Sequence, residues 1–335
     1  MNELLRNIIY AINGVVGNYG WSIVIFTLLI RLVLTPFDYK SRVGMRRMSA
    51  IQPQVTALQK KYANDQEKMN RKIQELYKKE RVNPLSSCLP MLITLPLLWI
   101  MFAAMRYVAN ENIVRQVFEI LEGKQITLDS WLWVKNLWMP DSPLAAVWPD
   151  LNTLRFTNDP IIWTKAFENA GNLPEALALT AESFSKANLT ATIENVVNYM
   201  RDNVAAYQEM TRGMDGLSNI PILFTSISVM KHYNGFFILP ILSAVTQFLM
   251  TAIQPQQPQA DPSGKQAGTG AFMKWFFPLF SLWICSSYNA IFALYWVASN
   301  VIAAIQTFII NKILDGQQAK GGSGKTPAVQ EGNLK

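Results

Sequence analysis

The chain has 335 residues, of which 50% are hydrophobic and 16% are charged, and its formal net charge is +7. Its mean hydropathy of +0.12 is high for a soluble protein and low for a chain that lies wholly within a membrane. Two cysteines, both in apolar runs, and a single histidine, His232, exclude a disulfide framework, a histidine metal cluster and a Ser–His–Asp hydrolase. We therefore expect no enzyme activity, no cofactor and no metal.

The first predicted element is an amphipathic segment over residues 1–16. Its apolar residues recur at helical spacing, as in a helix that lies on a membrane surface: Leu4, Leu5, Ile8, Ile9, Ile12 and Val15. A simple extension of the first membrane span is the alternative. The segment lacks a basic start and a small-residue cleavage site, so we do not interpret it as a cleaved signal peptide.

Long apolar runs predict transmembrane helices, because about 30 Å of hydrocarbon requires about 20 helical residues. The last apolar block, Trp275–Leu314, would overshoot the bilayer as one helix, and Ser286–Asn289 divides it at a tight reversal. The fold class is thus an all-α polytopic membrane protein with a bundle of five transmembrane helices. The five predicted spans are 17–37, 87–106, 236–253, 273–287 and 288–312.

The charges of the loops predict the topology. Residues 38–83 hold twelve basic and five acidic residues, whereas residues 107–235 hold nine basic and fourteen acidic ones. Basic residues concentrate in loops on the cytoplasmic side. We therefore expect a multi-pass protein of the bacterial cell membrane with its N-terminus outside and its C-terminus in the cytoplasm. The loop 254–272 and a disordered tail, 313–335, would also be cytoplasmic.

The cytoplasmic loop, residues 38–86, has the pattern of a helical hairpin. Asn64 is placed to cap the second helix, whose third residue is Glu67. The basic hairpin should attract anionic lipids at the inner leaflet, and it lacks the interleaved aromatic residues of a nucleic-acid site. The apolar residues of the two helices share a predicted seam: Met48, Ile51, Val55, Leu58, Tyr62, Met69, Ile73 and Leu76.

The segment 107–235 is expected outside the membrane. Its first part is rich in tryptophan, which favours a location at the outer membrane interface. Runs within 174–212 predict a small helical subdomain. Residues of about 144–233 form the part that we interpret as an insertion.

Arg31 interrupts the first apolar run, and two explanations remain open from the residues alone. It lies five residues before Pro36, or about 7.5 Å along a helix, so its side chain could snorkel to the cytoplasmic interface. Alternatively it faces a polar interior of the bundle, since an arginine at the bilayer centre costs about 2.5–3.5 kcal/mol. Polar residues of other spans favour the second explanation: Thr246, Gln247, Ser299, Asn300, Gln306 and Thr307.

Ordered motifs give the chain a strong resemblance to the YidC/Oxa/Alb family of membrane-protein insertases, most of all to the short form of Gram-positive bacteria. The resemblance covers roughly residues 15–143 and 236–312. It rests on these segments: "NYGWSIVIFTLLIRLVLTPFDYKS", "MSAIQPQVTALQKKY", "NPLSSCLPMLITLPLLWIMF", "WVKNLWMPD", "FILPILSAVTQFL" and "ALYWVASNVIAAIQ".

The resemblance implies a chaperone-like function. Five helices would enclose a hydrophilic groove with a central arginine, along which a nascent transmembrane segment slides into the bilayer. Nascent membrane proteins would be the substrates, and the Sec translocon and the ribosome would be partners. The chain departs from the family at Asn289 and Ile291, where a Pro and a Gly are common. The matching groove positions in this sequence are Arg31, Thr27, Gln247, Trp296, Asn300 and Gln306.

An anion transporter that uses Arg31 as its substrate site is the alternative function. Transporters of that kind are built from internal repeats. The sequence shows no inverted repeat, and five spans do not divide into two halves.

Overall fold

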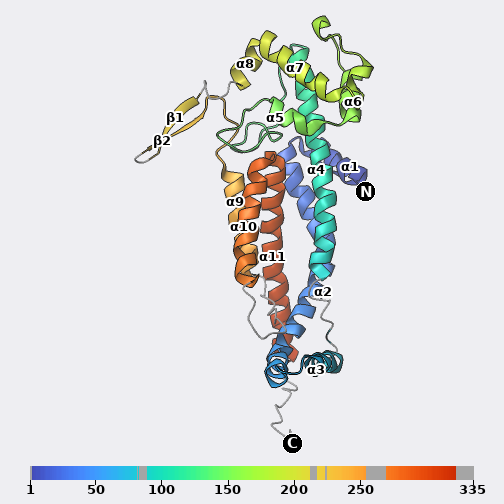
Figure 1. Ribbon diagram of the computed structural model, residues 1–335, viewed down its shortest axis with the longest axis vertical. Coiled ribbons are helices and arrows are strands. Elements are labelled where there is room, and N and C mark those ends of the chain that lie inside the picture. Colours follow the sequence, from blue (N-terminus) through green and yellow to red (C-terminus); the bar gives the residue numbers. More distant parts are fainter. Residues whose placement is uncertain are drawn as a thin grey trace, which may run out of the picture.

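The computed structural model describes residues 2–80, 82, 89–211, 217–222, 225–253 and 269–321. Long helices run side by side, with a group of shorter helices at one end and a helical hairpin at the other (Figure 1). Residues 254–268 of the predicted cytoplasmic loop 254–272 lie outside the described residues, and residues 269–272 belong to a helix. Cys88 and the tail beyond Gly321 also lie outside them.

The N-terminal half begins with two helices, α1 (Asn2–Val16) and α2 (Tyr19–Lys61). The Asn18 side chain accepts a hydrogen bond from the Trp21 N–H and so caps α2. We expected a hairpin helix separate from the first span, but α2 is continuous through Pro36 and Pro53. The end of the span itself at residue 37 stays a prediction. A neighbouring helix can support a helix that contains proline. Near Pro36, α11 packs along α2, and its Gln306 donates hydrogen bonds to the Arg31 carbonyl and to Thr35 Oγ1.

Four further long helices follow: α4 (Leu89–Leu121), α9 (Ile238–Ile253), α10 (Thr269–Ser287) and α11 (Ala290–Gly321). Within the described residues, two helices are long and apolar enough to cross a membrane, Tyr19–Lys61 and Ala290–Gln317, and Ile238–Ile253 is a shorter apolar helix. The count of five spans stays a prediction. The predicted reversal is confirmed, since α10 ends at Ser287 and α11 begins at Ala290.

Asn289, one of the two departures from the family pattern, begins α11. Its side chain accepts a hydrogen bond from the Phe292 N–H. The next two N–H groups, of Ala290 and Ile291, donate to the carbonyls of Met139 and Leu137. The first turn of α11 is therefore satisfied without the Pro and Gly that the resemblance led us to expect.

Two helices extend beyond their predicted spans. The α4 helix continues past residue 106 because its last turns bury Val114, Val117 and Leu121 against the segment above the bundle. The α11 helix continues past residue 312, where we expected a disordered tail. Its extension lies beside the lower half of α2, and Asp315 forms a salt bridge of 2.7 Å with Arg46 there.

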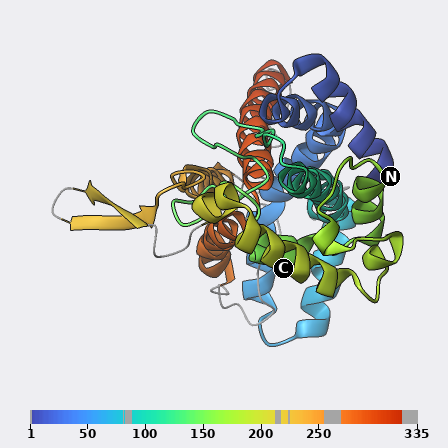
Figure 2. The ribbon, with the colours of Figure 1, turned by 90° about the horizontal axis from the view of Figure 1, so that it is seen from above.

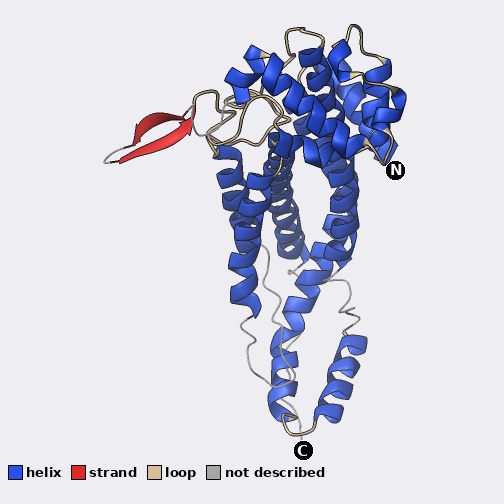
Figure 3. Cartoon of the chain, turned by 45° about the horizontal axis from the view of Figure 1, so that its top comes forward, coloured by secondary structure: helices blue, strands red, loops and turns tan. Residues whose placement is uncertain are grey.

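The helical hairpin at the lower end consists of the last turns of α2 and of α3 (Gln66–Lys79), as Figure 3 shows. Ile51, Val55 and Met69 are buried in the predicted seam. The cap of α3 is Asp65, whose carboxylate accepts from the Lys68 N–H, and not Asn64 as predicted. A turn of the chain places Asp65 directly before the helix.

The segment 107–235, called here the outer segment after its predicted location, holds most of the shorter elements. Its helices are α5 (Leu151–Leu154), η2 (Arg155–Thr157), α6 (Pro160–Glu168), η3 (Glu175–Leu177), η4 (Ala181–Phe184), α7 (Leu189–Asn203) and α8 (Ala205–Thr211). The predicted helical subdomain is thus confirmed for α7 and α8. Residues 174–187 form only two short 3₁₀ turns, because Ala178 is left-handed and Thr180 and Ser183 cap each other.

The outer segment also contains a β-hairpin that the helical prediction missed. Strands β1 (Leu217–Ile222) and β2 (Thr225–Met230) pair antiparallel, with Ile220 opposite Ile227. These sequences are rich in β-branched residues, which favour strands over helices. Seen from above, the hairpin projects away from the helices (Figure 2).

The main core lies where the outer segment meets the upper part of α4. Trp163 and Phe184 are fully buried and stack with ring centroids 6.1 Å apart. Gly20 at the top of α2 lies so close to the Trp131 ring that a larger residue there would collide with it. Burial of these aromatic rings fixes the outer segment on the ends of α2 and α4.

A second anchor joins the outer segment to α9. The buried Asn234 side chain donates hydrogen bonds to the carbonyls of Asn136, Met139 and Pro140, and it accepts one from the Asn136 N–H. Asp141 accepts from the N–H groups of Phe237 and Leu239 at the start of α9. These bonds satisfy the end of α9 and cover the upper end of the bundle.

Candidate functional site

A row of polar side chains follows the contact between α2 and α11, and we call it the polar seam. The α2 positions lie within one face of the helix because their spacing is close to whole turns. The two helices run in the same direction, so their residue numbers increase together along the seam. Its residues are Arg31, Thr35, Arg42 and Arg46 on α2, and Ser299, Gln306, Thr307, Asn311 and Asp315 on α11.

Arg31 occupies the upper end of the polar seam. It is partly buried, and its Nη2 donates a hydrogen bond of 2.6 Å to Ser299 Oγ. No carboxylate of the described residues lies within salt-bridge distance of this guanidinium. A guanidinium has five N–H donors, so one bond to a hydroxyl leaves most of its capacity for other acceptors.

Gln306 lies one level lower. Its Nε2 donates to the Arg31 carbonyl at 2.9 Å and to Thr35 Oγ1 at 2.8 Å. Its Oε1 is buried and has no hydrogen-bond partner within the described part of the chain. This amide therefore fixes the register of α11 against α2 and retains an unused acceptor.

The lower half of the polar seam carries two further arginines. Arg42 donates to Thr307 Oγ1, and Arg46 donates to the Asn311 carbonyl at 3.1 Å. Arg46 also forms the salt bridge with Asp315, whose side chain is 68% exposed. An ion pair as exposed as Arg46–Asp315 is weak, so the contacts along the polar seam differ in strength.

A second polar cluster lies on the other side of α11, against α9. Asn300 Nδ2 donates to Thr246 Oγ1 and to Gln247 Oε1, both at 3.2 Å. Because Ser299 and Asn300 are adjacent, they point to different neighbours around the helix. The structure thus brings Arg31 and Gln306 together, and it brings Gln247 and Asn300 together in a separate cluster.

The two remaining predicted site residues have other surroundings. Thr27 is buried, and its hydroxyl donates to the Ile23 carbonyl one turn back on its own helix. Trp296 packs against Phe292 with ring centroids 5.7 Å apart, and its buried Nε1 has no partner among the described residues. Neither residue hydrogen-bonds Arg31 or the cluster at Asn300.

Sequence reasoning missed three α2 members of the polar seam, Thr35, Arg42 and Arg46, and two on α11, Asn311 and Asp315. The signal on α2 is the successive spacing of four, seven and four residues that begins at Arg31. We had assigned Arg42 and Arg46 to a separate hairpin, so their continuity with Arg31 on one helix face was not apparent.

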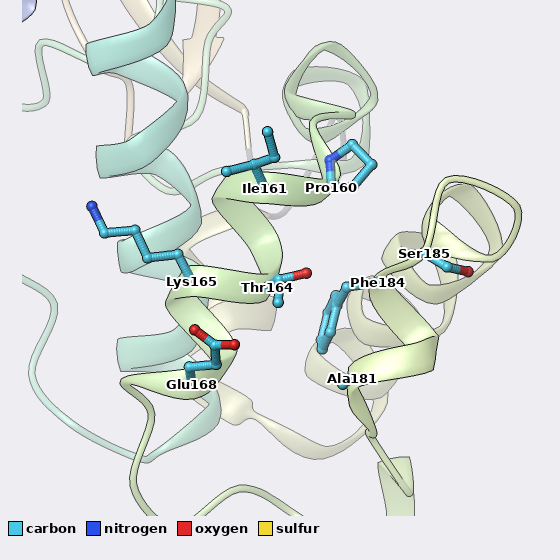
Figure 4. Close-up of a pocket in the computed structure, with 8 residues that line it drawn as sticks. All are labelled: Pro160, Ile161, Thr164, Lys165, Glu168, Ala181, Phe184 and Ser185. Atoms are coloured by element: carbon cyan, nitrogen blue, oxygen red, sulfur yellow. The ribbon is translucent and has the colours of Figure 1, made fainter. Parts of the chain in front are cut away.

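The described residues contain no group of three or more His, Cys, Asp or Glu side chains that could hold a metal ion. A shallow depression of about 390 Å³ lies in the outer segment between α6 and η4, lined by Ile161, Lys165 and Phe184 among others (Figure 4). Lys165 there is paired with Glu111 at 3.4 Å. This depression belongs to a different part of the fold from the polar seam.

Comparison with known protein families shows that a family model covers most of the chain. The family model described as 60Kd inner membrane protein matches residues 11–200 and 204–318. The matched residues include much of the segment that we interpreted as an insertion.

Individual relatives carry the name membrane protein insertase YidC. One from Coxiella burnetii (strain RSA 331 / Henzerling II) is 36% identical over 164 residues, which are 49% of this chain and 28% of the relative. One from Rickettsia felis is 27% identical over 312 residues, 92% of this chain and 39% of the relative. One from Fusobacterium nucleatum is 39% identical over 106 residues, 32% of this chain and 52% of the relative. The match covers about half of the relative from Fusobacterium nucleatum and less than two fifths of the other two relatives.

Proposed function

Because this chain belongs to the family of the 60Kd inner membrane protein, which is the YidC/Oxa1 family, we propose that it inserts nascent proteins into the membrane. The proposed process breaks no covalent bond. It consists of moving a polar segment across the hydrocarbon while an apolar helix enters the lipid.

The observation that carries the proposal is Arg31. It lies within an apolar stretch of α2, it is partly buried, and its guanidinium is held by a serine hydroxyl and not by a carboxylate. An arginine in such surroundings attracts acceptors, and a charge-assisted hydrogen bond is roughly twice as strong as a neutral one. An acidic or polar stretch of the substrate would be held there on its way outward.

Neighbouring polar groups extend this role. The unpartnered Oε1 of Gln306 can accept from a passing backbone N–H, and the unpartnered Nε1 of Trp296 can donate to a passing carbonyl. The Thr246–Gln247–Asn300 cluster can exchange its internal bonds for bonds to the substrate. Each exchange lowers the cost of bringing unpaired polar backbone into an apolar region. Together these groups would line a hydrophilic groove around α11.

The remaining parts follow from the predicted topology. We place the N-terminus outside and the C-terminus in the cytoplasm, with five spans and with the α2–α3 hairpin at the inner leaflet. There the hairpin would contact anionic lipids and receive substrates, alone or together with the Sec translocon and the ribosome. The outer segment would cover the outer end of the bundle.

The experiment is insertion into proteoliposomes of two single-span substrates that differ only in their translocated tail, acidic or neutral. Arg31→Ala should slow insertion of the acidic-tailed substrate by about tenfold, the effect expected for one charge-assisted hydrogen bond of about 1.5 kcal/mol. Arg31→Lys should retain much of the activity. Lys40→Ala is the matched control, since Lys40 is an exposed cation on the same helix. Wild-type insertion of both substrates by Arg31→Ala would overturn the role of this residue.

A further inference from the structure

Asp38 is an acidic residue that neither the resemblance nor the proposed function uses. It lies on α2 two turns after Arg31 and one turn before Arg42, which places all three on one face of the helix. Its side chain is partly buried. The charges of Arg31 and Arg42 both act on the Asp38 carboxylate.

Asp38 nevertheless has no hydrogen bond and no salt bridge to any residue that the structure describes. Both arginines point to hydroxyl groups of α11 instead, Arg31 to Ser299 and Arg42 to Thr307. Asp315, the other carboxylate beside the polar seam, is already paired with Arg46. Asp38 therefore stands between two guanidinium groups, neither of which it neutralises by direct contact.

We propose that Asp38 is the internal competitor of the substrate at Arg31: it lowers the positive potential there and so sets how many acidic residues a substrate needs to be held. This inference rests on the proposed insertase function and deepens it. The part of the polar seam above Arg46 then has two cations and one anion, which leaves one positive charge for the substrate.

The geometry explains why the Asp38 carboxylate does not form an ion pair with the Arg31 guanidinium. Seven residues of helix separate Asp38 from Arg31 by about 10.5 Å along the axis. The short aspartate side chain acts across that distance through its field, whereas the arginine is steered to Ser299 by a direct bond. A substrate carboxylate can approach the free N–H groups of Arg31 without first breaking an ion pair, which would cost more than displacing a hydroxyl.

Arg42 has a defined part in this arrangement. As the residue four positions after Asp38, it has the favourable orientation for an ion pair along a helix. Its positive charge therefore offsets part of the negative potential that Asp38 produces at Arg31. Without its charge, Asp38 acts on Arg31 alone, and Arg31 becomes a weaker site although it is unchanged itself.

The test compares four forms of the full-length chain in proteoliposomes: wild type, Asp38→Asn, Arg42→Gln and the double variant. Asparagine keeps the shape of aspartate, and glutamine removes the charge of Arg42 but keeps a polar N–H donor on a shorter side chain. The substrate is the acidic-tailed single-span protein, and the measurement is its initial rate of insertion. We expect Asp38→Asn to raise the rate and Arg42→Gln to lower it, each by about two- to fivefold, the range of partly exposed ion pairs. The double variant should return to the wild-type rate.

Glu182→Gln is the matched control, because it removes one negative charge from an exposed position of the outer segment, away from the polar seam, and it should leave the rate unchanged. The neutral-tailed substrate should respond to none of the variants. Unchanged rates for both Asp38→Asn and Arg42→Gln would overturn the inference, as would a double variant as slow as Arg42→Gln.

Arg31→Ala, measured beside these variants, separates the two proposals. If it slows insertion while Asp38→Asn and Arg42→Gln behave as wild type, the insertase role of Arg31 stands and the competitor role of Asp38 falls. If Arg31→Ala has no effect, the proposed role of Arg31 falls, and the competitor role of Asp38 falls with it.

Discussion

The outer segment and the polar seam use polar groups in opposite ways. In the outer segment, the buried side chain of Asn234 makes four hydrogen bonds to fixed backbone groups, beside a core of fully buried aromatic rings. In the polar seam, and among the residues that the structure describes, the Arg31 side chain makes one hydrogen bond, to a hydroxyl, and Gln306 keeps a buried acceptor without a partner. A fully satisfied network fixes one structure, whereas incomplete satisfaction leaves groups that can bind something else. We therefore expect variants of the outer segment to change stability and variants of the seam to change function.

The largest effect should come from the core of the outer segment. Trp163→Ala removes a fully buried ring and its bond to the Thr157 carbonyl, so the free energy of unfolding should fall by about 3–5 kcal/mol. Denaturant unfolding of the purified protein, followed by protease sensitivity of the outer segment, measures this. Ile161→Ala, two residues away and 71% exposed, is the control and should change little. Equal loss in both variants would contradict the comparison.

The Asn234 network should give the next largest effect. Asn234→Ala removes four hydrogen bonds and leaves the Asn136 N–H and the Pro140 carbonyl without this partner, which we expect to cost about 2–4 kcal/mol. The same unfolding measurement applies, with Asn203→Ala on the exposed end of α7 as the control. A loss below about 1 kcal/mol would mean that water satisfies these groups and that the network is not what holds α9 to the outer segment.

Ser299→Ala tests the polar seam, where we expect function to change more than stability. It removes a single hydrogen bond, so the free energy of unfolding should change by about 1 kcal/mol or less. The rate of insertion of an acidic-tailed substrate should change more than stability does, because Arg31 loses the contact that orients it. If Ser299→Ala unfolds easily but inserts the substrate at the normal rate, then the polar seam serves stability, as the outer segment does.

The smallest effect concerns pH. The hydrogen bond from Lys124, together with one from the Gly171 N–H, lowers the pKa of Glu122 from its usual 4.5. The contribution of Glu122 to stability is thus complete above pH 4.5 and is lost as pH falls through the lowered value. Wild type and Glu122→Gln should differ above pH 4.5 by about 1 kcal/mol or less, because the partner Lys124 is exposed, and should converge as pH falls below the lowered pKa. A gap that widens on acidification would refute the assignment.

Apolar length and turn residues were enough to predict elements whose ends depend on local sequence. The α9 helix was expected over 236–253 and spans Ile238–Ile253, and the break at Ser286–Asn289 lies where α10 and α11 meet. The continuation of α2 through Pro36 could not be predicted in this way, because a proline usually ends or kinks a helix and the helix that packs beside it, α11, lies far later in the chain. Tertiary contacts also extend α11 past residue 312.

The candidate site likewise has features that local sequence could predict and features that depend on tertiary contacts. Arg31 and Gln306 could be selected as polar residues in apolar runs, and the structure brings them together. The pairing of Arg31 with Ser299, and the turning of Thr27 toward its own helix, depend on the register between α2 and α11. That register is a property of packed side chains and has no signature within one helix. The strands β1 and β2 were missed for a simpler reason, since their β-branched alternation was weighed as part of a helical segment.

The unbroken course of α2 has a mechanical consequence. With 43 residues it is about 65 Å long, and some 45 Å of it lies below Arg31, against about 18 Å above. The top is clamped by Trp131 against Gly20, so this helix is a lever with a long lower arm and a fixed short one. If the proposed function holds, a client that docks on the hairpin would load the same continuous helix that carries Arg31 some 45 Å higher up.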